Sequence, residues 1–105
     1  MAICVLGCGA IGGSVAADLI EAGYDVTVVD QWPEHVEAMR SDGLVVTMPD
    51  GTVHVAVDAL HPCDLAARRP AFDVVLVAVK SYDTEWSVRL VEPYLARDGV
   101  LVGVQ

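Results

Sequence analysis

The chain has 105 residues, which is room for one domain of ordinary size. Its formal net charge of −9 would repel a phosphate backbone, which argues against nucleic acid or an acidic membrane surface as a partner. No apolar run approaches the roughly 18 residues of a membrane span, and the three cysteines form no C-x-x-C pair, so we expect no zinc site or disulfide framework and a reducing, cytoplasmic setting.

The N-terminal part predicts a strand, a glycine-rich turn, a helix and a second strand. Residues 2–6 form a continuous apolar run that ends in glycine, which is typical of a strand buried on both faces. Apolar residues then recur at helical spacing and predict a helix over 11–22, which ends at Gly23. The β-branched run 25–30 predicts a second strand, parallel to the first because the connection between them is long.

The rest of the chain continues this alternation and adds a hairpin. Strands over 44–48 and 52–58 flank Pro49-Asp50-Gly51, which is typical of a tight turn, so we expect an antiparallel pair. The other predicted elements are helices over 33–41, 62–69 and 82–96 and strands over 73–79 and 99–104. This order predicts an α/β fold of the Rossmann type, a doubly wound and mostly parallel sheet with an antiparallel hairpin.

A glycine-rich motif joins the first strand to the first helix. It matches G-x-G-x-x-G and consists of Gly7, Cys8, Gly9, Ala10, Ile11 and Gly12. Placed after a strand and at the start of a helix, the motif predicts a site for the diphosphate of a dinucleotide, which the N–H groups of the first helical turn would hold. A glycine-rich turn without a ligand is the alternative. A P-loop is excluded because no Gly-Lys-Ser/Thr follows.

An acidic residue ends the second predicted strand. Asp30 stands where a dinucleotide-binding domain carries the carboxylate that binds the ribose hydroxyls of adenosine. A carboxylate accepts hydrogen bonds from a 2′-hydroxyl and repels a 2′-phosphate, and neither Gln31 nor Trp32 supplies a cation, so NAD(H) is favoured over NADP(H). A solvated strand end is the alternative for Asp30. Trp32 either stacks on adenine or is an exposed or packed loop residue.

The chain resembles the N-terminal domain of the ketopantoate reductase (2-dehydropantoate 2-reductase) family over nearly its whole length. The residues that carry the resemblance are the glycine motif with Gly13, Ala22-Gly23, Gly43-Leu44, Asp50-Gly51, the segment Val79-Lys80-Ser81-Tyr82-Asp83-Thr84, and Gln105, which looks like the first residue of a Gln-Asn-Gly motif.

The resemblance implies that Val79 and Lys80 line the nicotinamide half of the cofactor site, with a solvated strand end as the alternative for Lys80. Family members commonly carry arginine, which suits NADPH, where this chain has Gln31. The family's helical catalytic domain, with its catalytic lysine, is expected to be absent from this sequence. We therefore assign residues 1–105 to a dinucleotide-binding domain and name no catalytic residue.

These observations predict the NAD(H)-binding domain of an oxidoreductase that reduces a 2-oxoacid or a related ketone. The domain is expected to be inactive alone, and a homodimer is a possible assembly. Its hydride chemistry would come from the cofactor. One alternative is a module that senses NAD(H) or another nucleotide without catalysis. A methyltransferase that uses S-adenosylmethionine is a third, and Gly12 and the Lys80 motif count against it.

Overall fold

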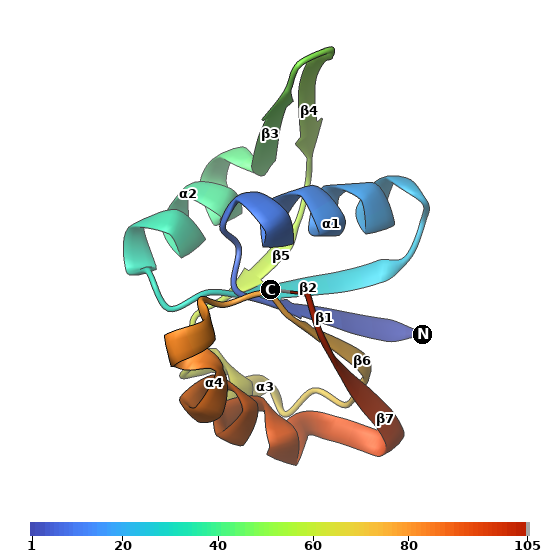
Figure 1. Cartoon of the computed structure of the whole chain (residues 1–105), viewed down its shortest axis with the longest axis vertical. Coiled ribbons are helices and arrows are strands. Elements are labelled where there is room, and N and C mark those ends of the chain that lie inside the picture. The colour runs from blue at the N-terminus through green and yellow to red at the C-terminus, as the bar shows by residue number, and fades with distance from the viewer. Residues whose placement is uncertain (105) are drawn as a thin grey trace.

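The computed structural model of the chain describes residues 1–104. It contains a five-stranded parallel sheet in the order β5-β2-β1-β6-β7 and a separate antiparallel pair, β3-β4 (Figure 1). The strands are β1 (Ala2–Leu6), β2 (Asp25–Val29), β3 (Leu44–Met48), β4 (Gly51–Val55), β5 (Asp58–Leu60), β6 (Phe72–Val77) and β7 (Leu95–Gly103). The helices are α1 (Ala10–Glu21), α2 (Pro33–Asp42), α3 (Asp64–Arg68) and α4 (Thr84–Val91), with 3₁₀ turns η1 (Ser81–Asp83) and η2 (Glu92–Tyr94). The predicted fold class is confirmed.

The parallel sheet is covered on both faces, which explains the continuous apolar run of its first strand. Successive side chains of a strand point to opposite faces. Ile3 and Val5 of β1 therefore belong to one buried cluster, with residues of α1 and α2, while Cys4 and Leu6 belong to a second cluster, with residues of α3 and α4. Figure 1 shows the same division, with α1, α2 and the hairpin on one side of the sheet and α3 and α4 on the other.

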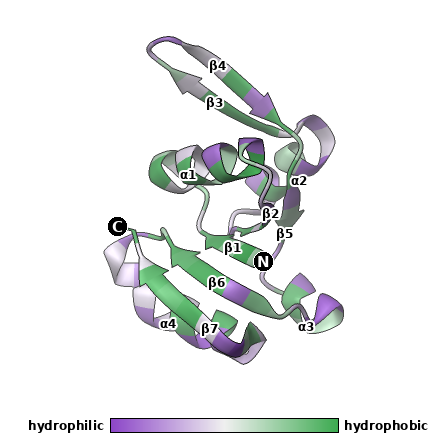
Figure 2. Cartoon of the chain, turned by 90° about the vertical axis from the view of Figure 1, so that its right-hand side faces the viewer, coloured by the Kyte–Doolittle hydropathy of each residue, from purple (hydrophilic) through white to green (hydrophobic). Residues whose placement is uncertain are grey.

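The expectation of one strand over 52–58 is wrong, because the structure divides this stretch into two strands. The hairpin ladder ends where Val55 pairs with Leu44, directly after Gly43 turns the chain with φ +84°. Beyond this point the stretch has no hairpin partner. Asp58–Leu60 instead pairs in parallel with β2 at the edge of the main sheet. The hairpin projects beyond α1, and its turn is the hydrophilic end (Figure 2).

The expectation of one helix over 82–96 is also wrong, because the helical stretch is shorter. It begins with η1, continues as α4 and ends in η2, whose first positions contain Pro93. Proline lacks the N–H group that would continue the helical hydrogen bonds. The chain then extends at once, so β7 begins at Leu95 rather than at residue 99. The short helix α3 likewise covers only the middle of the predicted stretch 62–69.

The strand order places a crevice at the carboxyl ends of the central strands. The chain crosses from β1 to β2 in one direction, and β6 later pairs with the opposite side of β1. Ligands of doubly wound sheets bind outside the carboxyl ends of the strands at this change of direction. Among residues 1–104, no helix has the length and apolar character to span a membrane, and no His, Cys, Asp or Glu side chains gather into a group of three that suits a metal ion.

Candidate nucleotide-binding site

A cavity of about 730 Å³ lies at the carboxyl ends of β1, β2 and β6. Three segments that are far apart in the sequence form its wall: the turn after β1, the start of α2 after β2, and the loop after β6. The cavity brings together nine of the predicted site residues: Gly7, Cys8, Gly9, Ala10, Ile11, Asp30, Gln31, Val79 and Lys80. Gly12 is buried behind the turn instead, and Gln105 lies outside the described residues.

The glycine motif forms a tight turn between β1 and α1. Gly7 adopts φ +96°, a conformation that side chains rarely allow, and its N–H donates to the carbonyl of Val29 at 2.8 Å. A Cβ atom at Gly12 would lie 2.0 Å from the carbonyl oxygen of Gly7, so only glycine lets α1 pack this closely. A Cβ atom at Gly9, in contrast, would meet nothing within 4 Å. Gly9 is therefore the glycine that leaves room in the cavity.

The start of α1 can bind an anion. The first turn of an α-helix leaves its N–H groups without intrahelical partners, and the helix dipole makes this end positive. The N-cap residue here is Gly9, which has no side chain to accept from these groups, and the first turn contains no acidic residue. The exposed residues Ala10 and Ile11 bring this turn to the cavity wall. The arrangement suits a phosphate group that approaches over Gly9.

Asp30 lies at the floor of the cavity and is only 5% exposed, so it is not a solvated strand end. Its carboxylate accepts hydrogen bonds from the N–H of Cys8 at 2.8 Å and from the N–H of Trp32 at 2.9 Å. The Nδ1 atom of His35 lies 3.5 Å from the same carboxylate. Asp30 thus fastens the glycine turn to the start of α2. Because each carboxylate oxygen accepts more than one hydrogen bond, it retains capacity toward a ligand.

Cys8 contributes its backbone to the site and its side chain to the core. The side chain is 3% exposed. Burial, and secondarily the charge of Asp30, raise the pKa of the Cys8 thiol to about 12. The positive end of helix α1 would lower this pKa, but the desolvation that comes with burial dominates. Cys8 is a small filler and not a nucleophile at neutral pH.

The loop after β6 forms another wall of the cavity. Val79 and the exposed Lys80 line the cavity in the loop after β6, which ends at Val77 and not at residue 79 as expected. The wall also contains Asp83 and Trp86, which the sequence analysis assigned only to the helix expected over 82–96. The one available signal was the position of Asp83, three residues after Lys80 at the end of a central strand.

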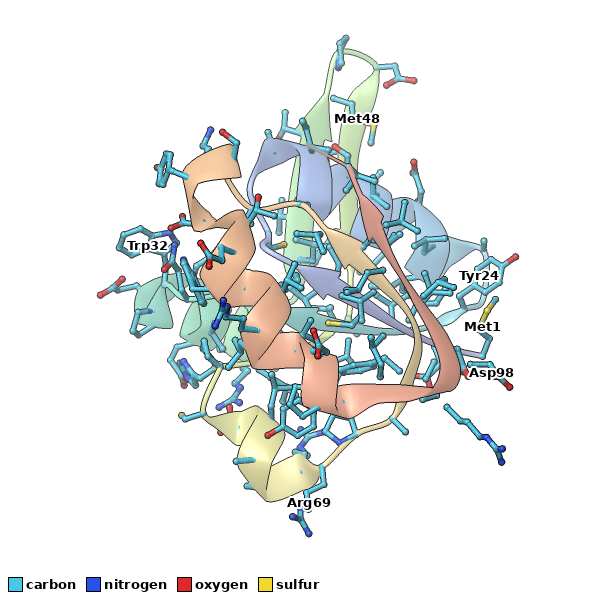
Figure 3. The ribbon with its side chains drawn as sticks, turned by 60° about the horizontal axis from the view of Figure 1, so that its bottom comes forward. Met1, Tyr24, Trp32, Met48, Arg69 and Asp98 are labelled. Atoms are coloured by element: carbon cyan, nitrogen blue, oxygen red, sulfur yellow. The ribbon has the colours of Figure 1, made fainter. Side chains whose placement is uncertain are left out.

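Trp32 marks the outer rim of the cavity. It is 63% exposed at the start of α2, where Figure 3 shows it at the periphery of the molecule. Trp32 is therefore an exposed residue of the loop and not a packed one. Its ring is available to a flat ligand group, as an exposed aromatic side chain beside a site can be.

Fold and site together define the chain as a nucleotide-binding domain of the Rossmann type. The family model described as "Ketopantoate reductase PanE/ApbA" matches residues 3–105, so the chain belongs to the ketopantoate reductase family. It is similar to 2-dehydropantoate 2-reductase of Nostoc sp., with 32% identity over 101 residues, which are 96% of this chain and 30% of the relative.

Two further proteins extend the comparison. The putative 2-dehydropantoate 2-reductase of Enterococcus faecalis has a similar structure, with a TM-score of 0.89 and 25% identity over all of this chain and 34% of that one. The potassium uptake protein TrkA of Mycobacterium tuberculosis is 42% identical over 78 residues, which are 74% of this chain and 32% of the relative. The chain thus spans about a third of the length of these proteins. It is homologous to the NAD(P)-binding domain of ketopantoate-reductase-like oxidoreductases.

Proposed function

We propose that the chain is the NAD(H)-binding domain of an oxidoreductase that reduces the carbonyl of a 2-oxoacid or a related ketone. The observation that carries this proposal is the open space over Gly9, in a cavity that also contains Asp30. When bound, the cofactor would supply the hydride. The N–H groups at the start of α1 hold the diphosphate, and the Asp30 carboxylate accepts hydrogen bonds from the ribose hydroxyls.

The same residues support NAD(H) over NADP(H). The Asp30 carboxylate accepts readily from a 2′-hydroxyl, whereas a 2′-phosphate would meet its negative charge at short range. Gln31, the next residue at the cavity, is neutral and offers no cation to a second phosphate. Arg40, the nearest arginine in sequence, is occupied elsewhere, because its guanidinium bonds the Ala59 carbonyl and Asp64.

Val79 and Lys80 extend the cavity beyond the glycine turn, and in the proposal they form the nicotinamide half of the site. The Lys80 ammonium is exposed at the end of β6, where it would face a ribose hydroxyl or a substrate carboxylate. No residue of the chain is assigned to proton transfer. We therefore expect the chain alone to bind the cofactor without turnover.

A titration with NADH, NADPH and S-adenosylmethionine tests the proposal, followed by fluorescence and by thermal shift. NADH is expected to bind most tightly, and at 100 times its Kd to stabilise the fold by about 2.7 kcal/mol. Gly9→Ala is expected to remove binding without unfolding the chain, because its Cβ meets no protein atom within 4 Å. Gly13→Ala is the matched control, since Gly13 does not line the cavity. Unchanged NADH binding by Gly9→Ala would exclude the diphosphate from this turn.

A nucleotide sensor without catalysis is the second candidate function, and what favours it is that one relative, 42% identical over 78 residues, is named for potassium uptake and not for a reaction. The two functions make different demands on the nicotinamide half of the site. A reductase must hold the nicotinamide ring in place, so NADH should bind more tightly than ADP-ribose. Equal affinities for NADH, ADP-ribose and ADP would instead support a sensor that reads only the adenosine diphosphate part.

Assembly and setting complete the proposal. The described cysteines Cys4, Cys8 and Cys63 are all free thiols, which supports a reducing, cytoplasmic setting. Val100 and Val102 are 51% and 42% exposed on β7, an edge strand of the sheet. Exposed apolar edges pair readily with other chains, which supports a homodimer. Light scattering at several protein concentrations tests the assembly, and a monomer at every concentration would refute it.

A further inference from the structure

A second carboxylate, which the proposed function does not use, lines the same cavity as Asp30. Asp83 ends the 3₁₀ turn after β6 and is half-buried. Its Oδ1 atom accepts from Nε1 of Trp86 at 2.8 Å, and its Oδ2 atom lies 3.4 Å from the Nε2 donor of Gln31. Gln31 directly follows Asp30. Both carboxylates therefore line one cavity, and Asp83 contacts the side chain of the residue that follows Asp30.

The Gln31–Asp83 contact matters because residue 31 stands beside the sugar in the proposed complex. A side chain at this position reaches toward the 2′ position of the adenosine ribose if Asp30 binds the hydroxyls. Asp83 lies within hydrogen-bond distance of the Gln31 head group, so its charge acts on the same region. In a partly desolvated cavity, a carboxylate at this short range repels a 2′-phosphate and so weakens the binding of a cofactor that carries one.

We propose that Asp83 is a second specificity-determining residue, which excludes a 2′-phosphate from the site together with Asp30. The inference rests on the proposed function, because it needs the adenosine to lie in this cavity. Its consequence is specific to this chain. An arginine introduced at position 31 would meet the Asp83 carboxylate within about the same distance as Gln31 does and would form an ion pair with it.

This pairing predicts that position 31 alone does not control the choice of cofactor. Gln31→Arg supplies a cation, but Asp83 neutralises it, so little of its charge remains for a 2′-phosphate. Only when Asp83 is also made neutral can the new arginine bind the phosphate. The effects of the two substitutions on NADPH binding are therefore coupled, as expected of residues in direct contact.

The experiment measures the Kd values of NADH and NADPH for the full chain and four variants. The variants are Asp83→Asn, Gln31→Arg, the double variant, and Asp50→Asn as a control. Asp83→Asn keeps an oxygen that accepts from Trp86 and removes only the charge. Asp50→Asn makes the same change in net charge at the hairpin turn, outside the cavity, and preserves the Pro-x-Gly turn sequence.

Asp83→Asn is expected to tighten NADPH binding at least about tenfold and to change the NADH Kd by less than about threefold, because loss of repulsion acts only on the charged 2′ group. The double variant is expected to gain more than the product of the two single gains. Equal changes in both Kd values would overturn the inference, since they would indicate that Asp83 only positions Trp86. An equal gain in Asp50→Asn would overturn it in favour of overall charge.

Two further results keep the test decisive. If Asp83→Asn melts at a lower temperature than the parent, the comparison is repeated with Asp83→Ser, which has neither the charge nor the hydrogen bond to Trp86. An unchanged NADPH-to-NADH Kd ratio in that variant refutes the role of Asp83. If the parent chain binds neither cofactor, the proposed function itself fails and the inference fails with it. If the parent binds NADH and substitutions at Asp83 leave the NADPH-to-NADH Kd ratio unchanged, the inference alone fails.

Discussion

Alanine substitutions at two neighbouring glycines of α1, Gly12 and Gly13, are expected to change the stability of the fold in opposite directions. Gly13 lies in the helix, and a Cβ atom there would meet the Cys8 sulfur at 3.8 Å, a Leu44 methyl at 3.9 Å and a Val46 methyl at 4.0 Å. These are ordinary van der Waals contacts. Glycine in a helix interior is less stable than alanine by about 1 kcal/mol. Gly13→Ala is therefore expected to stabilise the chain by about 1 kcal/mol.

Gly12 precedes it by one residue and gives the opposite expectation. Its Cβ would lie 2.0 Å from the carbonyl oxygen of Gly7 and 3.2 Å from the Ala78 side chain. The first contact is with backbone, which cannot rotate away as a side chain can. The helix-propensity gain of about 1 kcal/mol is outweighed by an overpacking cost of about 1–3 kcal/mol or more. Gly12→Ala is therefore expected to destabilise the chain and to displace the turn that is proposed to hold the diphosphate.

Thermal melts of both variants followed by circular dichroism test this pair. For a domain of this size 1 kcal/mol corresponds to a Tm shift of roughly 4–8 °C, so Gly13→Ala should melt that much higher than the parent and Gly12→Ala several degrees lower. NADH binding should survive in Gly13→Ala and be lost in Gly12→Ala. If the two substitutions shift Tm in the same direction, the packing described for the start of α1 is wrong.

Three further predictions concern the charged and titrating groups. Asp30→Asn is expected to cost about 1–2 kcal/mol in urea unfolding and to weaken NADH binding, because a charged acceptor of two backbone N–H groups is replaced by a neutral one; unchanged stability would contradict the fastening role. Burial raises the pKa values of Cys4 and Cys8 to about 12, from 9.0, so their contribution to stability is complete below pH 9 and declines toward pH 12. At pH 10 each thiol should have lost about 1.4 kcal/mol, and alanine at either position should flatten this alkaline decline. The backbone N–H of His61, with help from a neighbouring arginine, lowers the pKa of Asp64. The stability it contributes is present above pH 3.8 and is lost as pH falls through the lowered value, so Asp64→Asn should reduce the acid sensitivity of the melting temperature.

The parts of the fold that the sequence predicts well are those whose signals are local. The glycine motif specifies its turn through contacts among neighbouring residues and through the adjoining strand β6, so its role is readable from spacing alone. The apolar run of β1 likewise predicts burial on both faces. The strand Asp58–Leu60 was missed because nothing in its three residues distinguishes pairing with the hairpin from pairing with β2. That choice depends on where the edge of the sheet lies.

The candidate site shows the same limit. Asp30 was located from its distance to the glycine motif, but its burial and its bonds to Cys8 and Trp32 depend on how two loops meet. Asp83 was missed as a site residue because it comes from a loop fifty-two positions beyond Gln31. Its approach to Gln31 follows from the pairing of β1 with both β2 and β6. Spacing rules describe one βαβ unit, whereas this cavity wall comes from the second half of the sheet.

The proposed function requires an acidic chain to bind an acidic cofactor, and the distribution of charge within the cavity makes this physically reasonable. The net charge is −9, which opposes any diphosphate at long range. At the proposed diphosphate position, however, the wall consists of Gly9, Ala10 and Ile11, and backbone N–H groups supply partial positive charge there without a side chain. The carboxylates of Asp30 and Asp83 stand instead around residue 31, where the proposed complex places the sugar. In the proposed complex, backbone dipoles thus provide affinity for the two phosphates of the cofactor, and side-chain charge acts against a third phosphate, so the proposal reconciles one strongly acidic surface with both binding and selection.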